Sequence, residues 1–197
     1  MSPKSKKQFD EIRQKSRAKI MEVALELFAQ NGYHQTSISQ IAKSAAISKG
    51  LMYNYFASKE ELLTEIVMEA VQEFEKMSDT ILKMPNPPEE KLKWITESAI
   101  ELVQKDVKHW RLLTSLGLQT DVLTKLRDIL RIKSENGLEL AELLFFEMGF
   151  ENPRQEAYLY GAFLDGILLH YVMMQSLDLD YPITEVSNFI YERYNIK

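Results

Sequence analysis

The chain has 197 residues, of which 45% are hydrophobic and 27% charged, and this is enough apolar material for the core of a globular protein. It contains no cysteine, which excludes disulfides, thiolate zinc sites and cysteine nucleophiles. The net charge of -5, taken alone, disfavours nucleic acid as a partner.

The charges are distributed unevenly along the chain. Residues 1–60 contain ten Lys or Arg and five Asp or Glu, so they carry +5; since the whole chain carries -5, residues 61–197 carry -10. This asymmetry fits a nucleic-acid-binding end and fits a solvated basic tail equally well. No uninterrupted run approaches the ~18 apolar residues of a membrane span, and no signal-peptide core follows the basic N-terminus. We therefore expect a cytoplasmic protein without a membrane partner.

The spacing of apolar residues predicts an all-α fold of about nine helices. The first, residues 12–30, ends at Asn31-Gly32, a typical C-terminal signal. Two short helices follow at about 37–45 and 48–56. A longer helix then runs from Ser58, which opens a capping box, to Met84, and the remaining helices are predicted at 89–106, 110–118, 121–148, 152–177 and 182–194. We divide the chain into residues 1–60 and residues 61–197.

Residues 36–61, TSISQIAKSAAISKGLMYNYFASKEE, fit a helix-turn-helix motif. Ser37 with Gln40 forms a capping box for the first short helix, and Ser48 can cap the second. Apolar residues fall where the two helices must pack on each other, at Ile38, Ile41, Ala45, Ile47, Met52 and Tyr55. Two amphipathic helices can also be merely structural, so the residues left exposed decide the interpretation.

The second short helix leaves Lys49, Gly50, Leu51, Tyr53 and Asn54 exposed, with Lys59 just beyond. Lysine can donate to guanine or phosphate, leucine can touch a thymine methyl, and asparagine can pair with adenine. Glycine lets the backbone approach the duplex, and a tyrosine hydroxyl can donate to a phosphate. Lys59 lies in the first turn of its helix, where the helix dipole disfavours a cation and a shared phosphate would remove the conflict.

This segment resembles the N-terminal domain of TetR-family transcriptional regulators. The matching residues are Thr36-Ser37-Ile38, Ile41-Ala42, Ala45-Ala46-Ile47-Ser48-Lys49-Gly50, Met52-Tyr53, Tyr55-Phe56 and Ser58-Lys59-Glu60-Glu61-Leu62, preceded by Ala24, Leu27-Phe28 and Gly32-Tyr33. The resemblance covers roughly residues 12–64 and is highly specific. Beyond residue 64 only the length and the number of helices agree.

The resemblance implies a homodimer that binds a palindromic double-stranded DNA operator, usually as a repressor released by a small molecule. It also implies phosphate contacts from Tyr53 and Lys59 and from Thr36 and Ser37. Two positions depart from the family pattern. Ala46 replaces the usual turn glycine, and an alanine held there in the left-handed conformation costs roughly 1 kcal/mol. Leu51 stands where Thr or Ser is common, which indicates an apolar base contact.

We expect residues 61–197 to bind the ligand and to form the dimer. The last two helices carry more apolar surface than one subunit covers, which predicts a four-helix interface; a helix buried inside a monomer is the alternative. The predicted interface residues are Gly161, Leu164, Leu168, Tyr171, Ile183, Val186 and Ile190. A pocket for an apolar or aromatic effector could be built from aromatic residues, although most of these must belong to the core; the candidates are Trp94, Trp110, Phe145 and Phe163.

Other classes of function find little support. The sequence lacks H-E-x-x-H, a phosphate-binding glycine loop and G-x-S-x-G, so we expect no enzyme, no catalytic residue, no metal site and no cofactor. A DNA-binding structural or cell-division factor that needs no ligand remains an alternative. A helical partner-binding protein that has lost DNA binding is disfavoured by the retained Lys49, Gly50, Tyr53 and Lys59.

Overall fold

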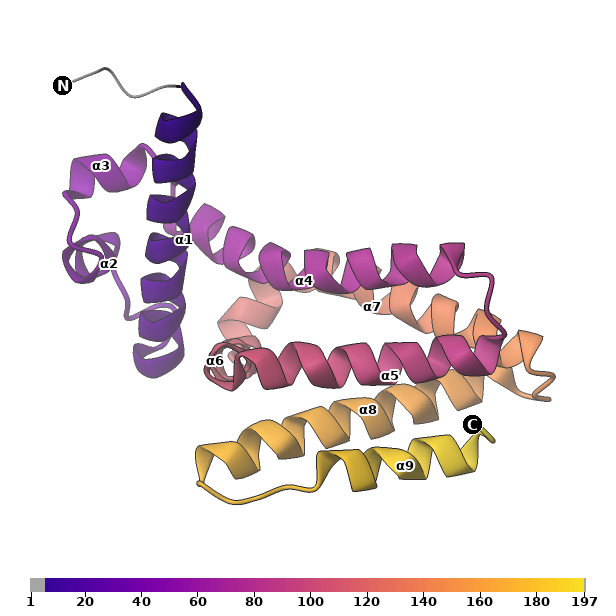
Figure 1. Ribbon diagram of the computed structural model, residues 1–197. Coiled ribbons are helices and arrows are strands. Elements are labelled where there is room, and N and C mark those ends of the chain that lie inside the picture. The colour runs from indigo at the N-terminus through magenta and orange to yellow at the C-terminus, as the bar shows by residue number, and fades with distance from the viewer. Residues whose placement is uncertain (1–5, 197) are drawn as a thin grey trace. The chain divides into compact units, whose positions relative to one another are not determined.

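The computed structural model describes residues 6–196, and over that range it contains nine α-helices and no strand (Figure 1). The helices are α1 (Lys6–Asn31), α2 (Ile38–Ser44), α3 (Lys49–Tyr53), α4 (Lys59–Lys83), α5 (Pro88–Lys105), α6 (Val107–Gly117), α7 (Thr120–Glu147), α8 (Pro153–Ser176) and α9 (Ile183–Arg193). Every helix overlaps the range predicted for it, so the all-α prediction is confirmed.

The chain divides into two compact units, with a boundary that differs from the expected one at residue 60. The first unit runs to Ala70 and also includes Leu112–Leu126, while the second comprises Val71–Arg111 and the chain from Arg127 onward. The first unit therefore takes in the start of α4, the end of α6 and the start of α7. Sequence patterns gave no sign of this, because the added segment lies far from the helix-turn-helix in the sequence.

The first unit is built on an apolar stripe along α1. Ile20, Ala24 and Phe28 follow one another at intervals of four residues and are fully buried. Such spacing places side chains on one face of a helix, and α2 and α3 lie beside this helix in Figure 1. Ile41 of α2 and Met52 of α3 are also fully buried, so the two short helices are held by their apolar faces and their other faces stay exposed.

The turn between α2 and α3 is fixed by a Schellman motif centred on Ala46. The amide N–H of Ile47 donates to the carbonyl of Ala42 at 2.9 Å, and the amide N–H of Ala46 donates to the carbonyl of Lys43 at 3.2 Å. Ala46 has a φ of 56°, the left-handed conformation that the sequence led us to expect. The strained alanine thus ends α2 and sets where α3 begins.

In the second unit α5, α8 and α9 lie side by side (Figure 1). Their core includes Leu92, Phe145, Tyr160, Ile190 and Tyr194, all less than 5% exposed. The phenol of Tyr160 lies 3.0 Å from the hydroxyl of Thr96, which in turn donates to the carbonyl of Leu92. These bonds pair the hydroxyls of Thr96 and Tyr160, whereas the buried hydroxyl of Tyr194 in the same cluster has no hydrogen-bond partner among the described residues.

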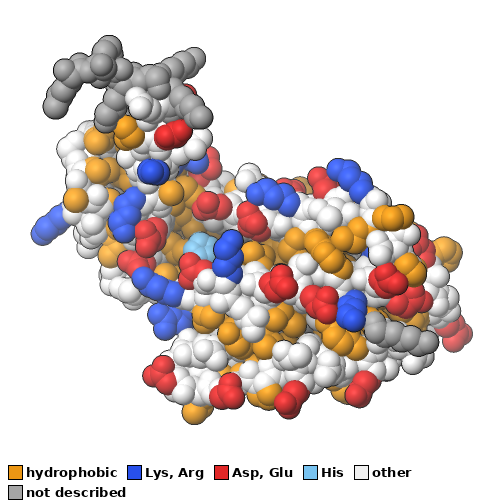
Figure 2. Space-filling model, viewed as in Figure 1, with side chains coloured by type: hydrophobic (Ala, Val, Ile, Leu, Met, Phe, Trp, Pro, Cys, Tyr) orange, Lys and Arg blue, Asp and Glu red, His pale blue; other side chains and the backbone are white. Residues whose placement is uncertain are grey.

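Helix α8 is partly covered within the subunit. Its buried side chains are Ala157, Tyr160, Ile167 and Val172, whereas Tyr158, Leu169 and Met173 are exposed. By length and composition alone this 24-residue helix could cross a membrane, although the sequence shows no uninterrupted apolar run of that length. On the face drawn in Figure 2, acidic side chains are scattered over the second unit with apolar ones between them.

The residues predicted for a dimer interface fall into two groups. Five of them are half-buried: Gly161, Leu164, Leu168, Tyr171 and Val186. Ile183 and Ile190, by contrast, are only 5% and 0% exposed, because they pack inside the subunit against the core cluster. Side chains with so little exposed surface can contribute almost nothing to contacts with a second copy, so these two residues belong to the core.

We expect Ala46→Gly to raise the free energy of unfolding by about 1 kcal/mol, because glycine adopts positive φ without the steric cost of a Cβ. Urea denaturation followed by circular dichroism measures this change. Ala45→Gly is the matched control: its φ is -78°, so glycine there only adds freedom to the unfolded chain and lowers stability. Equal stability of Ala46→Gly and the wild type would contradict a strained turn.

Candidate DNA interface

The helix α3 presents the exposed surface expected of a recognition helix. The Ser48 hydroxyl caps it by accepting the amide N–H of Leu51 at 3.1 Å. Met52 faces inward and is fully buried, while Leu51 and Tyr53 are 40% and 49% exposed. One buried anchor and a side-chain cap therefore fix the orientation in which the outer side chains are displayed.

The other predicted base-contacting residues share this exposed surface. Lys49, Gly50 and Asn54 are all exposed. A Cβ added at Gly50 would meet no atom within 4 Å, so the backbone here is open to close approach. The predicted set Lys49, Gly50, Leu51, Tyr53 and Asn54 is thus brought together on one short helix and its C-terminal end.

Thr36 differs from what the resemblance implied, whereas Ser37 stays at the surface. Thr36 is 1% exposed, and its hydroxyl lies 2.9 Å from the carbonyl of Gly32 and 3.1 Å from that of Leu27. Its side chain therefore fastens the turn after α1 and is not free for a phosphate. Ser37 is exposed and forms the predicted capping box with Gln40, which leaves its hydroxyl at the surface at the start of α2.

Lys59 also has a different role from the predicted phosphate contact. Its ammonium donates to the carbonyls of Tyr33 and Thr36, each at 2.9 Å, and lies 3.4 Å from that of His34. It also lies 4.4 Å from the centre of the Tyr33 ring. An ammonium has three donors, and these carbonyls take them up. The unfavourable placement of a cation in the first turn of α4 is thus offset by carbonyls rather than by a phosphate.

Gln119, between α6 and α7, is a residue that sequence reasoning missed. Its side-chain oxygen accepts the amide N–H of Tyr33, and its side-chain nitrogen donates to the carbonyl of Phe28, both at 2.9 Å. The two bonds tie the end of α1 and the turn after it to the α6–α7 junction. No local pattern marks Gln119, because its partners lie 86 and 91 residues away in sequence.

Charged groups of α7 reinforce this junction. The ammonium of Lys125 lies 3.0 Å from the carboxylate of Glu60, and the imidazole of His34 lies 3.3 Å from that of Asp121. The hydrogen bond from Lys125 lowers the pKa of Glu60, and burial, with help from the Glu60 charge, raises the pKa of Tyr33 above its usual value. Tyr33 thus stays a neutral phenol at the centre of the junction.

Of the aromatic residues predicted to bind an effector, three belong to or pack on one core cluster, and Trp110 has other contacts. Phe145 is fully buried in the core and packs against Tyr194, with ring centres 4.8 Å apart. Trp94 and Phe163 pack on the same core cluster, whereas Trp110 stacks edge-on against Phe74 and donates to the carbonyl of Leu102.

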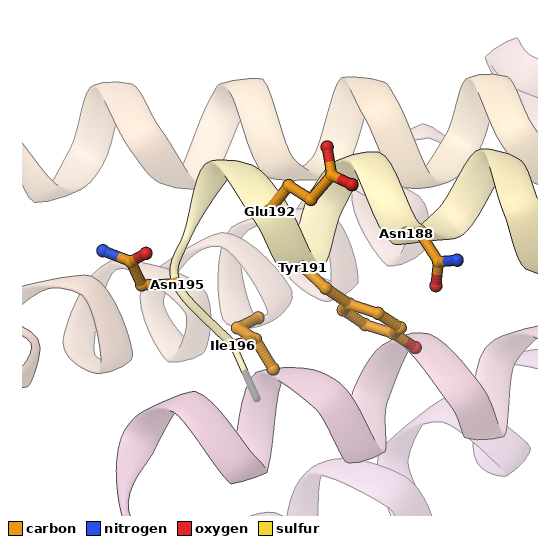
Figure 3. A pocket seen from close by; sticks show the side chains of 5 residues that line it. All are labelled: Asn188, Tyr191, Glu192, Asn195 and Ile196. Atoms are coloured by element: carbon orange, nitrogen blue, oxygen red, sulfur yellow. The ribbon is translucent and has the colours of Figure 1, made fainter.

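A shallow open pocket of about 400 Å³ occurs elsewhere, at the C-terminal end of α9. Figure 3 shows the side chains that line it: Asn188, Tyr191, Glu192, Asn195 and Ile196. None of the four predicted aromatic residues lines this pocket.

We expect Gln119→Ala to lower the free energy of unfolding by about 1–3 kcal/mol, because the part-buried amide of Tyr33 loses its acceptor. Urea denaturation followed by the intrinsic fluorescence of the protein provides the measurement. Gln30→Ala, which shortens an exposed glutamine in the last turn of α1, is the control and should change stability by less than about 0.5 kcal/mol. If the two variants are equally stable, the side chain of Gln119 does not hold the junction.

Comparisons with known proteins agree with this geometry. Residues 20–66 match the sequence model of the family "Bacterial regulatory proteins, tetR family". The chain is similar to the fatty acid metabolism regulator protein of Bacillus subtilis, with 31% identity over 115 residues that cover 57% of this chain and 59% of that protein. The aligned segment is thus little more than half of this curated relative's length.

Solved structures match over more of the chain. The transcriptional regulator FadR from Bacillus subtilis, in complex with stearoyl-CoA, superposes with a TM-score of 0.68 and 25% identity over 90% of this chain and 96% of that one. NalD of Pseudomonas aeruginosa, the secondary repressor of a multidrug efflux pump, gives a TM-score of 0.71 over 92% and 94%, but its 21% identity shows the fold alone.

The family match falls on the helix-turn-helix, the fold agrees along nearly the whole chain, and the relatives named here are regulators and not enzymes. Residues 20–66 are thus similar to the tetR family of bacterial regulatory proteins, and the fold of the chain is similar to that of solved transcriptional regulators.

Proposed function

We propose that the protein is a homodimeric transcriptional repressor that binds a palindromic operator through α3 and leaves it when a small molecule binds. The observation that carries this proposal is the exposed set on α3, held outward by the Ser48 cap and the buried Met52. Lys49 and Asn54 supply groups that distinguish bases, Leu51 supplies an apolar contact, and Tyr53 a phosphate donor. The +5 charge of residues 1–60 favours the duplex electrostatically.

A second copy is the partner we assign to the exposed face of α8. Tyr158, Ala162, Gly166, Leu169 and Met173 are exposed and follow one another at helical spacing. Ala162 and Gly166 are small, so another helix can approach closely. Two copies related by a two-fold axis would also match the symmetry of a palindromic operator.

A membrane is a less suitable partner for this face. The opposite side of α8 packs on α5 and α9, and four of its side chains are buried within the subunit. The same helix carries Arg154, Glu156 and Asp165, which a membrane-spanning helix would have to bury at a cost of several kcal/mol. Association with a second helix pair covers the apolar stripe without enclosing Arg154 and Glu156 in a bilayer.

Acyl-coenzyme A is the effector class that the comparisons favour. The relative with 31% identity is named a fatty acid metabolism regulator, and a solved structure at 25% identity holds stearoyl-CoA. The second unit is rich in aromatic and aliphatic side chains, and an acyl chain is the kind of group that such an interior can accept. A ligand that prefers a conformation whose two recognition helices do not match the spacing of successive major grooves would release the operator.

We expect the protein to enrich a two-fold symmetric site from sheared genomic DNA at near-physiological salt. The control is the double variant Lys49→Ala/Tyr53→Phe, which removes a cation and a hydroxyl from α3 while leaving Met52 and the caps intact. It should enrich no site, since base and phosphate contacts are both weakened. Enrichment of the same site by both proteins, or of none by either, would contradict DNA reading by α3.

Stearoyl-CoA should raise the melting temperature of the protein and dissociate it from the selected duplex. At about 100 times its dissociation constant, the ligand would add about 2.7 kcal/mol to the free energy of unfolding. Coenzyme A without an acyl chain is the control and should do neither. If stearoyl-CoA leaves both the melting temperature and the DNA complex unchanged, the effector belongs to another class; DNA binding is tested separately by the site selection.

A further inference from the structure

The position of Arg13 on α1 singles it out among the basic residues near the N-terminus. It precedes the buried Ile20 by seven residues, about two helical turns, so both lie on the same face of the helix. This is the face that packs on α2 and α3. Arg13 therefore extends the packed face of α1 past the core, where the neighbouring element is the end of α3.

The contacts of Arg13 place it against the recognition helix. Its guanidinium Nη2 lies 3.4 Å from the carbonyl oxygen of Asn54, the residue that caps the C-terminal end of α3. Both residues are exposed, and Asn54 follows the exposed Tyr53 directly. The charge of Arg13 thus lies at the edge of the surface that we propose meets the duplex.

The charge of Arg17, one turn further along α1, is already engaged. Its guanidinium lies 2.8 Å from the carboxylate of Glu65 and 5.1 Å from the centre of the Phe56 ring. Arg13, by contrast, forms no ion pair with any residue that the structure describes, and its hydrogen bond to Asn54 uses one of its five N–H donors. The four remaining donors form a planar fork suited to phosphate.

We infer that Arg13 binds a phosphate of the DNA backbone beside the site read by α3, and that it holds the C-terminal end of α3 by the same guanidinium. This inference rests on the proposed operator binding and extends it to a residue outside the helix-turn-helix. A phosphate supplies the negative charge that Arg13 lacks among the described residues. One guanidinium then binds both the DNA phosphate and the carbonyl of Asn54. The phosphate contact therefore also fixes the position of α3 along the duplex.

The test measures how DNA affinity depends on salt, by fluorescence anisotropy between about 50 and 200 mM KCl, the range in which phosphate contacts change affinity strongly. The probes are the duplex selected from genomic DNA and an unrelated duplex of equal length. Arg13→Gln should make the slope of log affinity against log salt shallower by about 0.9 for each subunit, hence by about 2 for a dimer. The loss should be similar on both duplexes, because a phosphate contact carries no base specificity.

Two further variants make the result specific. Arg13→Lys keeps the cation and should keep the slope, while losing the forked geometry. Lys15→Gln removes the same charge from the same helix, but Lys15 lies about 200° around α1 from Arg13 and should leave the slope unchanged. Circular dichroism confirms that each variant is folded before its binding is measured.

The outcomes separate this inference from the proposed function. If the wild type binds neither duplex, operator binding itself fails and the inference falls with it. If the wild type binds but Arg13→Gln keeps its slope, or Lys15→Gln loses as much, the phosphate contact at Arg13 is wrong while DNA binding stands.

Discussion

The turn between α1 and α2 is the constraint on which the first unit depends. Where α1 ends, its last carbonyls and the following amides have no helical partners, and buried backbone groups left unpaired are costly. The protein satisfies them with three side chains from different places: Thr36 from the turn itself, Lys59 from the start of α4 and Gln119 from the α6–α7 junction. The position of α2, and through it of α3, follows from these bonds.

The same constraint explains why part of the site could be predicted from sequence and part could not. Ser48, Ala46 and the exposed face of α3 are local features, since a cap, a left-handed turn and a helix face each involve residues within a few positions of one another. Lys59 and Thr36 carry groups that suit a phosphate, but which carbonyls lie near them is decided by tertiary packing. Gln119 had no sequence signal at all, because an isolated glutamine resembles any surface glutamine until its partners are known.

In the second unit the helix boundaries were predictable and the roles of the apolar side chains were not. A helix that is apolar nearly all round shows that two faces are covered, but its sequence does not say which face meets its own subunit. Ile183 and Ile190 turned out to lie inside, whereas the exposed stripe of α8 runs through Tyr158, Leu169 and Met173. The aromatic residues posed the same difficulty. A phenylalanine such as Phe145 can line a pocket or fill a core, and only its complete burial shows that it belongs to the core.

The first unit is assembled from segments that lie far apart in the sequence. Its boundaries at Ala70, Arg111 and Leu126 fall inside α4, α6 and α7. The first-unit end of α4 carries Lys59, and the junction of α6 with α7 carries Gln119. Both side chains hold the same turn after α1. The backbone that positions α3 is therefore held by hydrogen bonds at two separate points of the first unit, and each bond has a geometry that tolerates little displacement before it is lost.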